Sequence, residues 1–169
     1  MVSAISEYCT DSVVLEGKDR VKKLSGKLAG AYYPGTLLYM SSTGIWTATT
    51  GTASFNAQRR QVGVLEFKKR TSATFGEVDI DTAYTKGTAI NVEVIVGPLD
   101  GTIKVAVIAK AFGATAYYGQ AITTTSGGAA FAMGSAFATI ASHSSIGFVA
   151  EEGYTTGDTV VRYYMTSRG

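Results

Sequence analysis

Apolar and polar positions along the chain alternate in short stretches and do not follow a helical period. Residues 77–81 place Val78 and Ile80 on one face of an extended strand and three carboxylates on the other. Similar apolar runs, separated by glycine-rich turns, predict strands at 13–15, 35–40, 62–67, 91–96, 102–108 and 159–165. The alanine-rich segment 129–141 could hold a short helix, although Gly134 interrupts it. The pattern predicts an all-β barrel or sandwich.

The spacing of turn residues predicts one hairpin in the middle of the chain. The segments 91–96 and 102–108 flank the sequence Gly97-Pro-Leu-Asp-Gly101. Asp-Gly is a common turn pair, so we expect these two strands to pair with each other across a longer loop.

Glycines recur at a constant spacing, which indicates an internal repeat. Each of three glycines has a counterpart 84 positions later (119 − 35): Gly35, Gly44 and Gly63 match Gly119, Gly128 and Gly147. Segment 88–95 then matches 158–165, 70 positions later. Chance alignment within a glycine-rich β chain is the alternative.

The repeat predicts two related small β-barrel or β-tulip-like units and an extended N-terminal arm. The predicted divisions are an arm at 1–20, a first unit at 21–109 with an insertion at about 67–81, and a second unit at 110–169, packed with the first. The arm is either a frayed end or a segment that adds a strand to a neighbour's sheet. Its candidate residues for contact with another subunit or protein are Tyr8, Val13, Val14 and Leu15.

Composition narrows the classes of function. The net charge of +2 is too small to indicate nucleic-acid wrapping, and no apolar run approaches the roughly 18 residues that span a membrane. The single cysteine, Cys9, excludes an internal disulfide but leaves a crosslink between subunits open. We therefore expect neither nucleic acid nor membrane as a direct partner.

Residues suited to catalysis or metal binding are few. His143 is the only histidine, and no Gly-x-Ser-x-Gly motif accompanies it. Glu77, Asp79 and Asp81 could ligate a hard cation, but a flat row of carboxylates is more often a solvated face, here with the basic run 68–70 across from it. We expect no enzyme activity, no metal and no cofactor.

Tyrosine pairs point toward assembly. Adjacent strand residues face opposite sides, so the pairs 32–33, 117–118 and 163–164 each place one ring outward. Outward tyrosines favour protein interfaces. Trp46 follows a turn and is either a core residue or the platform of a carbohydrate- or ligand-binding β module.

Four segments resemble the capsid decoration, or cement, proteins of tailed double-stranded DNA viruses. They are 34–38 (PGTLL), the turn at 42–44, 61–65 (QVGVL) and 86–92 (KGTAINV). The resemblance covers about 30–96, with a weaker echo over 113–165.

This resemblance implies a non-enzymatic protein of the virion, located on the capsid exterior. Members of that family typically form homotrimers, bind the major capsid protein and clamp neighbouring subunits, often through an N-terminal arm. The hypothesis from the residues and the resemblance together is capsid stabilisation by bridging, and the carbohydrate- or ligand-binding module is the alternative.

Overall fold

The computed structural model describes residues 12–49, 62–69, 78–79, 92–109, 118–132, 146–150 and 159–166. Strands dominate these residues, and the only helical segments among them are two short 3-10 turns, η2 (Lys18–Arg20) and η3 (Ser126–Gly128). The predicted all-β fold is therefore confirmed. No helix in the described ranges is long and apolar enough to cross a membrane.

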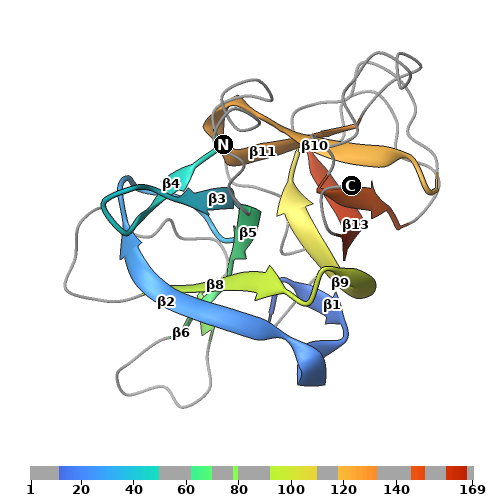
Figure 1. Cartoon of the computed structure of the whole chain (residues 1–169), viewed down its shortest axis with the longest axis horizontal. Coiled ribbons are helices and arrows are strands. Elements are labelled where there is room, and N and C mark those ends of the chain that lie inside the picture. The colour runs from blue at the N-terminus through green and yellow to red at the C-terminus, as the bar shows by residue number, and fades with distance from the viewer. Residues whose placement is uncertain are drawn as a thin grey trace.

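Five strands close into a barrel, and six others form a second sheet beside it (Figure 1). The barrel contains β2 (Lys22–Leu28), β3 (Leu37–Met40), β4 (Ile45–Ala48), β5 (Val62–Leu65) and β8 (Val92–Gly97). The second sheet contains β1 (Val14–Glu16), β9 (Asp100–Ile108), β10 (Ala121–Thr125), β11 (Ala129–Ala132), β12 (Gly147–Val149) and β13 (Val160–Thr166). A separate pair joins β6 (Lys68–Lys69) to β7 (Val78–Asp79).

The second sheet repeats the strand order of the barrel. Around the barrel the neighbours are β2, β8, β5, β3 and β4, and a parallel pairing returns β4 to β2. The second sheet places β9, β13, β12, β10 and β11 in the same order. A parallel bridge between Ala109 and Ala130 links the ends of that series, as Leu28 and Trp46 do in the barrel. The second sheet is thus a less closed copy of the barrel, with β1 added at its edge.

Residue pairing across the strands agrees in the two copies. Leu38 lies opposite Gly63 in the barrel. Ile122 lies opposite Gly147 in the second sheet, and each is 84 positions later. The two hairpins, β3–β4 and β10–β11, agree by the same offset. The repeat that the glycines indicated is therefore present in the backbone pairing.

One offset of the sequence alignment needs correction. β13 follows β8 by 69 positions, because Tyr164 takes the place of Ile95 (164 − 95), whereas the sequence match used 70. A slip of one residue exchanges the two faces of a strand, so the sequence match aligned inward-facing residues of one strand with outward-facing residues of the other. β9 matches β2 with an offset of 81 (104 − 23) and is hydrogen-bonded within the second sheet, although the predicted boundary after residue 109 places it in the first unit. The division at 109 as a domain boundary stays a prediction.

The predicted central hairpin is wrong. β8 pairs with β2 and β5, whereas β9 pairs with β1 and β13. The chain crosses from the barrel to the second sheet at Gly97-Pro98, so the two strands serve different sheets. The start of the alanine-rich segment, which could have been helical, is strand β11, while residues 133–141 lie outside the described ranges.

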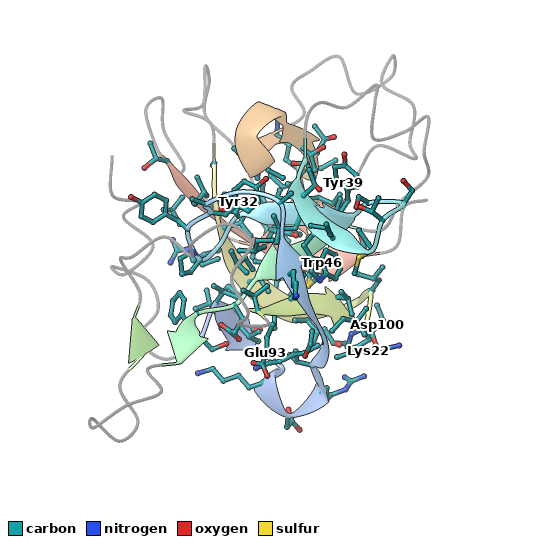
Figure 2. The ribbon with its side chains drawn as sticks, turned by 90° about the vertical axis from the view of Figure 1, so that its left-hand side faces the viewer. Lys22, Tyr32, Tyr39, Trp46, Glu93 and Asp100 are labelled. Atoms are coloured by element: carbon teal, nitrogen blue, oxygen red, sulfur yellow. The ribbon has the colours of Figure 1, made fainter. Side chains whose placement is uncertain are left out.

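Trp46 fills the interior of the barrel. It is buried with Leu38, Leu65 and Val94 in one hydrophobic cluster (Figure 2). Gly26 on β2 lies close to its indole ring, and a Cβ at residue 26 would come within 2.7 Å of that ring. The ring therefore packs directly on the backbone of β2, which explains a glycine within that strand.

The barrel and the second sheet share a larger hydrophobic cluster. Leu37, Val64 and Ile95 point out of the barrel, yet all three are fully buried in this cluster. Their partners include the inward-facing Ile122 and Tyr163 of the second sheet. Two backbone hydrogen bonds, from Ile108 to Gly35 and from Gly128 to Thr49, cross the same junction. The outer face of the barrel is thus an internal packing surface.

The segment before β1 is held at this junction by the carboxylate of Glu66. Glu66 is only 3% exposed and accepts hydrogen bonds from the Ser12 hydroxyl at 2.7 Å and the Val13 amide at 2.9 Å. The amide of Phe67 donates a third hydrogen bond at 2.9 Å, and Lys23 lies 3.4 Å away. From residue 12 onward, the predicted arm is therefore part of the body, and β1 adds to β9 of its own chain.

We predict that Glu66→Ala lowers the free energy of unfolding by about 2–4 kcal/mol. The substitution leaves two buried amides without an acceptor and removes one of the two carboxylates that lie beside Lys23. Glu93→Ala is the matched control, because Glu93 contacts the same lysine at 3.6 Å with a side chain that is 42% exposed. It should cost less than about 1 kcal/mol. Urea denaturation measures both, and equal effects would contradict the anchoring role of Glu66.

Candidate functional site

The outer face of the second sheet is the counterpart of the buried outer face of the barrel. Ala121, Phe148 and Tyr164 occupy the positions of Leu37, Val64 and Ile95 by the offsets of 84 and 69. Phe148 and Tyr164 are only partly buried, in contrast to their counterparts. One copy packs this face against its neighbour, whereas the other copy leaves Phe148 and Tyr164 partly accessible and buries Ala121.

Three aromatic rings form a strip on this accessible face, which we call the aromatic strip: Tyr118, Phe148 and Tyr164. The centroids of Phe148 and Tyr164 are 5.3 Å apart, with the rings tilted by 33°. Tyr118 meets the edge of Phe148 at 6.4 Å in a T-shaped arrangement, and it is 59% exposed. Both separations lie within the range in which aromatic pairs attract each other beyond simple burial.

A charged pair forms one border of the strip. Glu16 on β1, Lys104 on β9 and Tyr164 on β13 lie in one row across three adjacent strands. The Tyr164 hydroxyl donates a hydrogen bond of 2.8 Å to Glu16, and the Lys104 ammonium donates one of 3.4 Å to the other oxygen of the same carboxylate. β1 therefore both covers the edge of β9 and fixes the ring of Tyr164.

The hydrogen bond to Glu16 raises the pKa of Tyr164, with further contributions from burial and from the charge of Glu16. The neutral phenol is the donor, so ionisation would break the bond and place two negative charges together. Burial alone raises the pKa of the neighbouring Tyr163, whose ring points into the core. The pair at 163–164 thus has one ring inward and one outward, as the alternation predicted.

The four contact residues predicted from the sequence do not share one environment. Val13 and Val14 are buried in the shared cluster, and Leu15 packs against it. Their side chains stabilise this chain, so no accessible contact is left for Val13 or Val14 in this conformation. Tyr8 lies outside the described residues, as do Cys9 and His143, and the expectations for them stay predictions.

The acidic row is described only at Val78 and Asp79, and Glu77 and Asp81 lie outside the described residues. Asp79 pairs with Lys68 across β6 and β7, which agrees with the expectation that the basic run lies opposite. Within the described ranges, no group of three or more His, Cys, Asp or Glu residues could hold a metal ion.

An exposed strip of aromatic rings with a charged border is suited to binding another surface. Tyrosine and phenylalanine bury large areas with few rotatable bonds, and a polar border supplies orientation. Sequence reasoning anticipated one outward ring in the pair 163–164 without deciding which. It missed Phe148, because that residue stands in a short apolar run that gives no sign of which residues face outward. The repeat offset could have identified it, since Phe148 matches the outward-facing Val64.

Comparison with known proteins gives weak similarity to solved structures alone. No protein-family model matches the chain, and no curated protein matches it. Among solved structures, the chain is similar to the crystal structure of the head fiber gp8.5 N base of bacteriophage phi29. The sequences are 16% identical, the match covers 88% of this chain and 98% of that chain, and the TM-score is 0.46. A likeness at this level does not identify a function.

We predict that Glu16→Ala lowers the pKa of Tyr164 toward the ordinary tyrosine value of about 10. Because the folded pKa is raised, this contact stabilises the fold below that ordinary value, and the contribution is lost as pH rises through the folded pKa. The variant should therefore lose stability less steeply than the native protein at alkaline pH. Titration of the Tyr164 ring carbon by NMR measures the pKa. Asp19→Ala serves as the charge-matched control, and an unchanged pKa in the Glu16 variant would contradict the assignment.

Proposed function

We propose that this chain is a structural protein of a tailed-virus particle that binds the outer surface of the capsid and stabilises it by bridging neighbouring capsid subunits. Its partner in this proposal is the major capsid protein, and its role is binding without catalysis. The sequence resemblance to decoration proteins supports the proposal, and the all-β fold agrees with it.

The observation that carries the proposal is the accessible aromatic strip. The equivalent face of the barrel is one that this fold uses for tight packing, because Leu37, Val64 and Ile95 are fully buried there. The second copy presents Phe148 and Tyr164 at the same positions without such cover. We propose that the capsid surface covers this face of the second sheet.

Bridging follows from repetition of this contact over a symmetric shell. A protein that binds only the assembled surface stabilises that surface by mass action. When one oligomer of this protein contacts several capsid subunits at once, each contact raises the effective concentration for the contact that follows. A homotrimer would supply three aromatic strips, and we include this oligomeric state in the proposal. Sedimentation equilibrium measures it directly.

The alternative function, a carbohydrate- or ligand-binding module, was based on Trp46, which is not accessible to a ligand. Trp46 is 2% exposed and packs against Gly26 inside the barrel. A ligand could reach this indole only if the barrel opened. The aromatic strip is therefore the surface of the described residues on which binding should be tested.

The test uses shells of the virus that encodes this chain, assembled without the chain, and purified protein added back. We predict that the double variant Tyr118→Ser, Phe148→Ser binds shells at least about tenfold more weakly, as expected when central aromatic contacts are lost. Co-sedimentation of protein with shells measures the affinity. Circular dichroism and the melting temperature establish that the variant is folded.

Tyr118→Phe is the matched control, because it keeps the ring and its edge contact with Phe148. It should bind within about twofold of the native protein. Binding of the double variant with native affinity would refute the role of the strip. Failure of the native protein to bind shells would refute the capsid proposal as a whole.

A further inference from the structure

β9 and β2 are equivalent strands in the internal repeat, but their outer edges have different neighbours. β9 is bordered on one side by β13 and on the other by β1. Among the described residues, its counterpart β2 is bordered by β8, and β4 reaches it only at Lys27 and Leu28. The first four residues of β2, Lys22 to Ser25, are all exposed. In the repeat, this is the stretch of edge that β1 covers on β9.

Equivalent residues occupy the two edges. By the offset of 81, Lys23 and Leu24 correspond to Lys104 and Val105. Those two residues of β9 lie opposite Glu16 and Val14 of β1. The edge of β2 therefore has the same side-chain order as an edge that already binds a strand in this molecule.

The backbone of Ser25 is directed toward this open edge. The carbonyl of Glu93, opposite Ser25, accepts a hydrogen bond of 3.0 Å from the amide of Glu66 and so faces β5. In an antiparallel pair the two opposed residues either bond to each other or both face away. The amide and carbonyl of Ser25 thus point away from β8. Its counterpart Ala106 donates from the same position to the carbonyl of Val13 at 2.9 Å.

Charge selects the occupant of this edge. Between residues 18 and 27 the chain has five basic residues and one acidic residue. Pairing of two copies through β2 would bring two lysine-rich strands side by side, which is electrostatically unfavourable. β1 of a second copy is already engaged, because Glu66 holds its start and Val14 is buried. The edge is suited to an extended acidic segment of a different protein.

We propose that the exposed edge of β2 binds an extended segment of a partner protein as an added antiparallel strand, with an apolar residue opposite Leu24 and a carboxylate opposite Lys23. The template is Val14-Leu15-Glu16 on β9, where Glu16 lies opposite Lys104. Addition of a strand to a sheet edge is an established mode of peptide recognition. This inference does not rest on the capsid proposal, since it concerns another surface and its test needs no shells.

The probe is a synthetic peptide with the sequence of residues 12–17, SVVLEG, added to isotope-labelled protein. We expect the amide signals of Lys23, Leu24 and Ser25 to shift on titration. The same peptide with Glu16→Lys should bind about fivefold more weakly, because a favourable cross-strand charge pair becomes a repulsive one. Equal affinity of the two peptides would overturn the acidic specificity.

Ser25→Pro removes the edge donor while leaving the pairing with β8 intact, since proline is tolerated where the amide faces outward. It should abolish peptide binding, and Ser25→Ala, which keeps the amide, should not. If the proline variant fails to fold, a peptide methylated on its backbone nitrogens replaces it and should not bind native protein. Signal changes confined to Val105 and Ala106 would mean exchange with β1 and would overturn the proposal, as would absence of binding.

Discussion

The packing of the barrel's outer face against the second sheet is the interaction on which the rest of the structure depends. The outward-facing side chains of the barrel pack in the hydrophobic cluster that also contains the core of the second sheet; they are Leu37, Val64 and Ile95. Since hydrophobic burial is roughly proportional to the apolar area removed from water, this junction contributes to the stability of both halves. It also makes the two copies unequal. The face that one copy buries is the face that the other copy exposes.

Several other features are consequences of this unequal packing. The N-terminal segment enters at the junction, where the buried carboxylate of Glu66 supplies the acceptor for its amide. From there β1 covers the edge of β9 and brings Glu16 to Tyr164. The corresponding edge of β2 receives no such strand among the described residues. The aromatic strip and the open edge of β2 are therefore two surfaces that one copy leaves accessible, whereas the equivalent surface of the other copy is packed against another part of the chain.

Sequence predicted the fold class and most strands because alternation and glycine spacing are local signals. Among the strands that it missed is β2, whose sequence KKLSGKL has few apolar residues because that strand is largely exposed. It also paired β8 with β9 in a hairpin, since nothing local reveals that two adjacent strands belong to different sheets. Val13 and Val14, which the sequence offered as candidate contacts, are buried in their own chain, and local sequence does not distinguish the two roles. Aromatic contacts across β12 and β13 depend on register, which the one-residue error in the alignment had obscured.

The central claim is that the two halves share one backbone pattern and that β1 covers only one of two equivalent edges. Residue-specific amide hydrogen exchange of the free protein, followed by NMR, tests it most directly. Ser25 and Ala106 occupy equivalent positions, but only Ala106 donates to the segment that contains β1. The account predicts slow exchange at Ala106 and fast exchange at Ser25, although both neighbouring strand pairings are intact. Equal protection of the two amides, or faster exchange at Ala106, would contradict it.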